Sequence, residues 1–422
     1  MRSVINLFVL LLLLLLLFRA SEGAYVSELG KLYPCVAPCT DYGIVITPQD
    51  KPHTLSISVY KFSLRKDREI KPTDIKKIKT TPSEVPIDYD KVFSGNVSIG
   101  MYILPLVKAA EKAIPRDQHL TSPILFSVNE RLVAQNPFAW FKQIGEINLV
   151  FANKTVPFLV SPFSVDELKA HTEALFKWQL INFLIGDLSS KTVGVLSFNS
   201  RMGSEVSFEK RVLDQSVTDL TTIAGISHAV VTSNFFRKGD ILPLNTYLKA
   251  ISSPRKAVIE SPCGPKGVKK RFKGLRGVKW IVGTGDIEKC RSIIRRVLLS
   301  ICDKINGCAY LKEPIKGKII GYPDVGETMK QLGYDSCAEH LTPAKLDAAI
   351  RRVCGGNGKA AKGGKSSPRV IFNCVNGNFL YLMLTKGYKM KDSTSIEIKN
   401  EIAGLKVDTS LGELLMKMKL LD

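Results

Sequence analysis

Residues 42–62, which read YGIVITPQDKPHTLSISVYKF, decide the fold. Residues 42–46 form an apolar run rich in β-branched side chains, typical of a buried strand. Residues 55–60 alternate apolar and polar side chains, as a half-buried return strand does. The segment therefore predicts two antiparallel strands joined by a short turn. Such a turn binds phosphate when it is rich in glycine and begins with an acidic residue, because backbone N–H groups close on the phosphate and the carboxylate holds metal-bound water.

This segment resembles the first conserved region of the ecto-nucleoside triphosphate diphosphohydrolases, or apyrases, which reads roughly YGIVLDAGSSHTSLYIYKW. The flanking strands match closely, but TPQDKPHT stands where the family has DAGSSHT. Thr47 replaces the acidic residue and no glycine remains. Pro48 and Pro52 supply no N–H group and cannot adopt a positive φ. The turn is therefore a degenerate phosphate clamp within a family-like hairpin.

A later stretch resembles the family's third conserved region, EGAYGWITINYLLG. Residues 173–186 read EALFKWQLINFLIG. The resemblance implies that Glu173 is the general base that activates the attacking water, a role that requires a carboxylate within hydrogen-bond reach of that water. Ala174 replaces the neighbouring glycine. The alternative is that Glu173 only occupies the start of a helix, where a negative charge is favourable in any protein.

The second and fourth conserved regions are also degenerate. Relatives read GALDLGGASTQITF where residues 194–208 read GVLSFNSRMGSEVSF, so Ser197 takes the position of the aspartate and Asn199 and Ser200 replace the glycine pair. In the second region, GATAGMRLL in relatives, only Arg131 matches. Both phosphate clamps are therefore altered in one chain, which favours loss of hydrolysis.

Weaker resemblances continue to residue 412, and together they cover nearly the whole chain after its first residues. They imply an α/β fold of the two-lobed, actin-like (ribonuclease-H-like) type with a cleft between the lobes. We expect an N-terminal lobe over residues 24–187, completed by the C-terminal segment 395–422, and a C-terminal lobe over 188–394. Residues 61–89 and 355–368 resemble insertions or linkers.

The N-terminus predicts entry into the secretory pathway. Residues 1–23 combine a basic start, a Leu-rich stretch and a small-residue cleavage site, as a signal peptide does. No second segment approaches membrane-spanning length, so we expect a secreted chain without a membrane anchor. Asn96 and Asn153 begin N-glycosylation sequons, which are usable in that pathway.

Nine cysteines indicate disulfides, because none has zinc-type CxxC spacing and the predicted compartment is oxidising. The resemblance to the apyrases implies the pairs Cys263–Cys290, Cys302–Cys308 and Cys354–Cys374. It leaves Cys35, Cys39 and Cys337, for which a Cys35–Cys39 pair is one possible arrangement. No metal-ligating set is assigned.

The chain carries 60 Lys and Arg against 39 Asp and Glu, a formal net charge of +21. The densest basic run lies within residues 266–279 and contains Lys269, Lys270, Arg271, Lys273 and Arg276. This charge favours polyanions such as glycosaminoglycans, anionic membranes, nucleic acid or nucleotides. No nucleic-acid-binding signature accompanies it, so sequence-specific nucleic-acid binding is not expected. The alternative is a generally basic, solvated surface.

These observations lead to three hypotheses of function. The first is a secreted apyrase-family protein in which hydrolysis of nucleoside tri- and diphosphates is lost or strongly reduced, with nucleotide or polyanion binding retained. The second is an active phosphatase that uses Glu173 as base, Ca²⁺ or Mg²⁺ as cofactor and Asp50 in the role of the missing acid. The third is a basic binding protein without enzymatic activity. The sequence does not predict an oligomeric state.

Overall fold

The structure is a computed structural model. It describes residues 39–49, 53–64, 70–133, 136–153, 155–161, 164–186, 192–199, 203–209, 218–235, 243–252, 257–272, 279–299, 311, 313–334, 340–355 and 369–421. None of the helices within these ranges has both the length and the apolar character needed to cross a membrane.

The first sheet contains the predicted strand pair at its centre. Its described strands are β1 (Cys39–Gln49), β2 (Thr54–Leu64), β3 (Ile75–Ile78), β4 (Glu84–Pro86), β5 (Ile124–Asn129) and β6 (Val165–Leu168). Their order is β3-β2-β1-β5-β6, and β4 also pairs with β2. β1 runs antiparallel to β2 and parallel to β5. Residues 61–89 are therefore not a simple linker, because β3 and β4 within them extend this sheet.

The strands of the first hairpin are longer than predicted. The β1–β2 ladder continues to the pairs Thr47–Ser56, Pro48–Leu55 and Gln49–Thr54. β5 pairs only with residues 44–46 of β1, so Pro48 lies beyond the three-stranded part of the sheet. A proline is tolerated there because few ladder hydrogen bonds need its missing N–H. Thr47 is thus a strand residue and not the first residue of a turn.

The second sheet has the order β15-β14-β7-β8-β10-β9. Its strands are β7 (Gly194–Asn199), β8 (Gly203–Glu209), β9 (Thr218–Ile223), β10 (Ile226–Phe235), β14 (Ile319–Gly321) and β15 (Ile396–Ile398). Two smaller sheets are β11-β13-β12, formed by Val258–Ser261, Lys279–Gly283 and Lys269–Phe272, and the pair β16 (Glu401–Ile402) and β17 (Leu405–Lys406).

Helices cover both large sheets. They are α2 (Tyr89–Phe93), α3 (Gly100–Ala113), α4 (Glu130–Val133), α5 (Pro137–Phe151), α6 (Ala170–Ile185), α7 (Pro243–Ile251), α8 (Ile287–Ile294), α9 (Pro323–Gln331), α10 (Pro343–Cys354), α11 (Arg369–Leu382) and α12 (Thr409–Lys417). Short 3₁₀ segments occur at Pro72–Asp74 and Arg116–Thr121, and π-helical turns at Arg295–Leu299 and Met383–Gly387.

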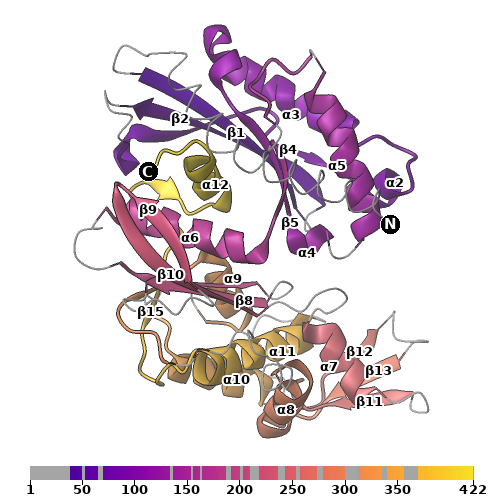
Figure 1. The fold of residues 1–422 in the computed structure, drawn as a ribbon. Helices are drawn as coiled ribbons and strands as arrows, with labels where there is room; N and C mark the ends of the chain where they lie inside the picture. The colour runs from indigo at the N-terminus through magenta and orange to yellow at the C-terminus, as the bar shows by residue number, and fades with distance from the viewer. Residues whose placement is uncertain are drawn as a thin grey trace, which may run out of the picture.

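The predicted mixed α/β, two-lobed architecture is confirmed (Figure 1). One core joins the first sheet to α3 and α5, and another joins the second sheet to α7–α11. A third core contains α6 and α12 together with residues of both sheets, so these two helices lie between the lobes. β15 pairs within the second sheet, whereas α12 contacts β1 of the first. The lobe boundary at residues 187 and 188 remains a prediction.

Two glycines allow α12 to approach its neighbours closely. A Cβ atom on Gly412 would lie 2.8 Å from the carbonyl oxygen of Phe176 in α6, and one on Gly43 would lie 2.8 Å from Leu414 Cδ2. Any side chain at either position would therefore push α12 away from α6 or from β1.

Two of the predicted disulfides are confirmed. Cys263, just after β11, is bonded to Cys290 of α8, and Cys354 at the end of α10 is bonded to Cys374 of α11. The predicted Cys302–Cys308 pair lies outside the described residues, as do Cys35 and Cys337. Both confirmed bonds fasten helices of the second lobe.

Candidate active site

Glu173 lies in the first turn of α6, between the two sheets. The start of this helix is fixed by Glu130, whose Oε2 accepts a hydrogen bond of 3.0 Å from the backbone N–H of Ala170. The Glu173 side chain is buried, and Asn129 at the end of β5 donates a hydrogen bond to its Oε2. The carboxylate is therefore held by the first lobe on one side.

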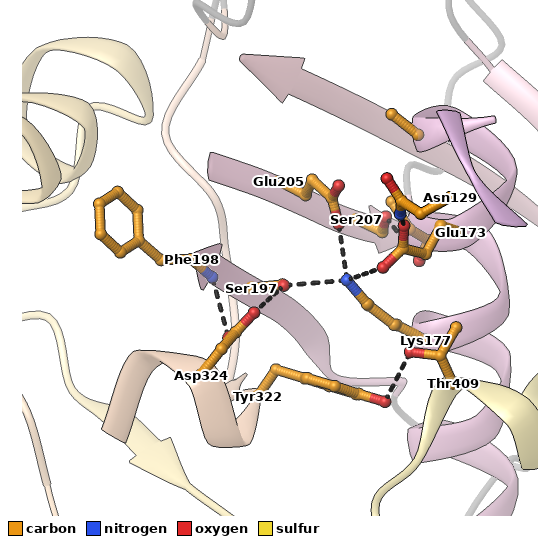
Figure 2. Close-up of polar contacts among 12 residues, drawn as sticks. Asn129, Glu173, Lys177, Ser197, Phe198, Glu205, Ser207, Tyr322, Asp324 and Thr409 are labelled. Carbon is orange, nitrogen blue, oxygen red and sulfur yellow. Dashed lines mark hydrogen bonds and ion pairs between the residues drawn. The ribbon is translucent and has the colours of Figure 1, made fainter. Parts of the chain in front are cut away.

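Lys177, one turn further along α6, holds the other carboxylate oxygen. Its Nζ lies 2.7 Å from Glu173 Oε1 and 2.9 Å from Glu205 Oε2 of β8. The same ammonium donates to the Ser197 hydroxyl at 3.0 Å and lies 5.1 Å from the centre of the Tyr322 ring (Figure 2). Two carboxylates, one hydroxyl and one aromatic face thus surround a single buried cation.

This arrangement explains how α6 carries a lysine into the interior. Burying an unpaired charge costs several kcal/mol, so buried charges are paired and hydrogen-bonded. Both carboxylates beside Lys177 are themselves buried, so removal of either charge type would leave the other as an uncompensated buried charge. The cluster is therefore a mutually dependent unit.

Lys177 was not among the site residues predicted from the sequence, although a signal was present. Lys177 follows Glu173 by four residues, the spacing at which opposite charges meet on a helix. It also interrupts a run of large apolar residues and stands at the second glycine of the EGAYGW pattern that this stretch resembles. A charged residue in place of a glycine on a buried helix indicates an internal ion pair.

Asp324, in the first turn of α9, extends the cluster on the side of the second lobe. Its Oδ2 accepts a hydrogen bond of 2.7 Å from Ser197 Oγ, and its Oδ1 accepts one of 3.0 Å from the backbone N–H of Phe198. Ser197 therefore links Lys177 to Asp324 (Figure 2). Asp324 was not among the residues predicted from the sequence.

Tyr322 lies at the edge of the cluster that faces α12. Its hydroxyl is hydrogen-bonded to Thr409 Oγ1 at 3.0 Å. Burial raises the pKa of the Tyr322 phenol well above its ordinary value, and the carboxylates of Asp408, Asp324 and Glu173 raise it further. The phenol is therefore neutral at physiological pH and presents an electron-rich ring face to the ammonium of Lys177.

The first hairpin presents a neutral cluster instead of an acid. Thr47 Oγ1 lies 3.0 Å from Ser56 Oγ, and Gln49 Nε2 donates to both hydroxyls at 3.2 and 3.3 Å. The backbone of residues 47–49 belongs to the strand ladder. In a ladder, successive N–H groups point to opposite sides, whereas a phosphate nest needs them to converge.

The remaining predicted residues are only partly described. Arg131 lies in α4 and Asn199 at the end of β7, but their side chains are not described, and Asp50, Ser200, Lys273 and Arg276 lie outside the described residues. The basic residues Lys269, Lys270 and Arg271 lie on β12. The two sequon residues, Asn96 and Asn153, are exposed after α2 and α5. Of the predicted site residues, the structure thus brings together Glu173 and Ser197, through Lys177.

The described residues do not fit a divalent metal site. Among them, no group of three or more His, Cys, Asp or Glu side chains is close enough to hold a metal ion. Ca²⁺ and Mg²⁺ are bound by sets of oxygen ligands. Here Glu173 and Glu205 share the Lys177 ammonium, which occupies the place between them.

Comparison with known proteins places the chain in a family. The sequence profile of the GDA1/CD39 (nucleoside phosphatase) family matches residues 40–422, and the chain belongs to this family. No curated protein matches it in a direct search.

Two solved structures are similar to the chain. A crystal structure of nucleoside triphosphate hydrolases from Neospora caninum matches with a TM-score of 0.65 at 11% identity, covering 96% of each chain. A crystal structure of an exopolyphosphatase-like protein matches with a TM-score of 0.42 at 8% identity, covering 89% of this chain and 99% of the other. The first likeness shows that the chain has the two-lobed fold of nucleoside triphosphate hydrolases.

Proposed function

We propose that this member of the nucleoside phosphatase family hydrolyses nucleoside tri- and diphosphates very slowly or not at all. One observation supports the proposal above the others: Lys177 Nζ lies 2.7 Å from Glu173 Oε1 and 2.9 Å from Glu205 Oε2. The carboxylate that the family resemblance marks as the general base is thereby engaged as the counter-ion of a buried lysine.

The chemistry of a general base explains why this contact matters. A base must present a lone pair to the attacking water and gain stability by taking its proton. One oxygen of Glu173 contacts an ammonium and the other accepts from Asn129. Both carboxylate oxygens of Glu173 therefore already have a partner that a water molecule would have to displace or share.

The same contacts guide our proposal for nucleotide binding. Among the described residues no oxygen-ligand set surrounds Glu173 and Glu205, so we infer that a bound nucleotide lacks an organised metal to bridge its phosphates. We therefore infer that any remaining binding is weak, sensitive to salt and almost independent of Ca²⁺ or Mg²⁺, as attraction to a basic protein is.

We also assign the protein to the secretory pathway. The two disulfides in the second lobe require an oxidising compartment for their formation. Asn96 and Asn153 are exposed at the ends of α2 and α5, where an attached glycan meets solvent. The signal peptide itself lies outside the described residues, so secretion and glycosylation remain part of the proposal.

Phosphate release tests the proposal. The wild-type protein and the Glu173→Gln variant are incubated with ATP and with ADP in the presence of Ca²⁺ or Mg²⁺, beside an active nucleoside triphosphate hydrolase as positive control. We expect both proteins to remain at least 100-fold below the control, and to differ from each other by less than twofold. Calorimetry with a non-hydrolysable ATP analogue, with and without metal, then measures binding.

Two results would overturn the proposal. One is wild-type turnover close to that of the control together with its loss in Glu173→Gln, which would establish Glu173 as a working base. The other is tight nucleotide binding that requires metal and is insensitive to salt, which would show that an organised metal site exists.

A further inference from the structure

A small sheet at the far end of the second lobe presents an exposed aromatic and basic face. β13 pairs with β11 on one side and β12 on the other. The register places Val258, Trp280 and Arg271 in one row across the three strands. Figure 1 shows these strands at the periphery of the lobe, remote from α6.

Burial shows which way this row faces. Side chains alternate between the two faces of a strand, so Ile259 and Ile281 lie on the opposite face from Trp280. Both isoleucines are buried in the core of the second lobe. Trp280 is 47% exposed and Val258 49% exposed, and Arg271 is exposed beside them. The row therefore faces solvent.

The basic residues of β12 divide between the two faces. Lys269 lies two residues before Arg271, so both belong to the outer face, about 7 Å apart along the strand; both are exposed. Lys270 points the other way, and burial lowers the pKa of its ammonium. Lys266, just before β12, is also exposed. The described part of the basic run thus places Lys269 and Arg271 as outward-facing cations on β12, next to Trp280.

The composition of this face indicates its ligand. A half-exposed tryptophan offers a flat apolar surface that packs well against the C–H face of a sugar ring. Lys269 and Arg271 beside it match groups that carry negative charge, and Arg pairs with planar or tetrahedral oxyanions through several hydrogen bonds. Among the described residues of the three strands, the outer face carries one acidic side chain, Glu260, which lies on β11 at the edge away from the cations.

We propose that the outer face of the β11-β13-β12 sheet binds a sulfated polysaccharide. Trp280 stacks on a sugar ring, and Lys269 and Arg271 pair with sulfate groups on the same chain. A bilayer is a poorer fit, because a single aromatic residue on a flat sheet inserts little apolar area. The proposal concerns a surface separate from α6 and does not depend on the loss of hydrolysis.

Heparin is the probe for the test, with heparin stripped of its sulfates, anionic lipid vesicles and single-stranded DNA as comparison probes. Affinity is measured by surface plasmon resonance on the full chain at 0.15 M salt. The variants are Trp280→Ala, Trp280→Phe and the double variant Lys269→Ala/Arg271→Ala. The matched control is Lys108→Ala/Lys330→Ala, which removes the same charge from exposed sites on α3 and α9.

We expect the Lys269/Arg271 double variant to weaken heparin binding at least tenfold and the control double variant less than twofold. Trp280→Ala, with no change of charge, should weaken binding about fivefold or more, while Trp280→Phe keeps near wild-type affinity and shows that the sheet still folds. Removal of the sulfates should abolish binding.

Three outcomes would overturn the proposal. Equal losses in the two double variants would mean that heparin senses only net charge. An unchanged affinity in Trp280→Ala would remove the stacking contact. Binding of vesicles or DNA that depends on Trp280, when heparin binding does not, would assign this face to another ligand.

Discussion

The helices α6 and α12 each carry a buried Glu followed by a Lys one turn later, and the two pairs differ in what surrounds them. On α6, Lys177 joins Glu173 to Glu205 and to Ser197. On α12, Lys417 Nζ lies 2.9 Å from Glu413 Oε1 and 3.2 Å from Asp166 Oδ2 of β6. The hydroxyl of Ser127 on β5 donates to Glu413. Each helix thus meets a strand carboxylate and a strand serine of one sheet.

Exposure separates the two clusters. The side chain of Lys177 is 5% exposed and that of Glu205 2%, whereas Lys417 is 22% exposed and Asp166 50%. The Lys417–Asp166 pair borders water, where an ion pair contributes little. Lys177 is enclosed, and the carboxylates of Glu173 and Glu205 beside it are 10% and 2% exposed. The same local sequence pattern therefore produces an enclosed ion cluster on α6 and, on α12, a cluster whose Lys417 and Asp166 reach water although Glu413 is 1% exposed.

The largest effect on folding stability is expected for Lys177→Met. The variant leaves Glu173 and Glu205 buried without their counter-ion, and removing one member of a buried ion pair costs about 3–5 kcal/mol of folding free energy. Urea denaturation followed by circular dichroism measures the free energy of unfolding.

A matched control and a rescue sharpen this test. Lys142→Met, on the exposed face of α5, should change stability by less than about 0.5 kcal/mol. Adding Glu173→Gln and Glu205→Gln to Lys177→Met should restore most of the loss, because the buried carboxylates are then neutral. A loss below about 1 kcal/mol in Lys177→Met would contradict an ionised, interdependent cluster.

Lys417→Met should lower the free energy of unfolding less than Lys177→Met does, by about 1–2 kcal/mol at pH 8. The buried carboxylate of Glu413 keeps its hydrogen bond from Ser127, and Asp166 returns to water. Burial alone would lower the pKa of Lys417, but Glu413 and Asp166 raise it above its ordinary value. A raised pKa in the folded state gives stability that is complete below the unfolded pKa of about 10.4 and is lost as the pH rises through the folded pKa.

Unfolding free energies of the wild type and Lys417→Met at pH 8, 10 and 11 check this sign. The difference between the two proteins should shrink as the pH rises. A difference that is constant, or that grows with pH, would mean that Lys417 contributes through packing and not through its charge.

The smallest effect, measured on phosphate release, is expected for Thr47→Asp/Ser197→Asp, which restores the two acidic positions of the family pattern. Thr47 lies in the strand ladder, so the new carboxylate stands beside backbone that cannot close on a phosphate. The aspartate at position 197 adds a further carboxylate beside Lys177 and leaves Glu173 bound. Phosphate release from ATP should stay within twofold of wild type. A tenfold gain would show that the acids alone were missing.

The sequence predicts those features of the fold that follow from local patterns or from the family resemblance. They include the β1–β2 hairpin, the place of Glu173 at a helix start and the pairs Cys263–Cys290 and Cys354–Cys374. The predicted strands of the first hairpin were too short because residues 47–54 were assigned to the turn of the family pattern. In the structure the strand pairing continues through Thr47–Ser56 to Gln49–Thr54.

The ion cluster was not predicted because its members lie far apart in the chain. Lys177 and Glu205 are separated by 28 residues, and Ser197 and Asp324 by 127. Glu173 and Lys177 suggest a pair from spacing alone, but the same spacing occurs at Glu413 and Lys417 with a different degree of burial. Only the fold decides which pair is sealed from water.

The close fit of α12 also constrains the order of events during biosynthesis. Leu414 of α12 packs against β1 at Gly43, and α12 can lie this close to β1 and α6 only because Gly43 and Gly412 lack side chains. The first sheet draws its strands from residues 39–168, yet α12 belongs to residues 409–417. A ribosome adding about 5–20 residues per second delivers that helix many seconds after the sheet has emerged. The apolar side of the first sheet that α12 covers therefore stays exposed until nearly the whole chain has been synthesised.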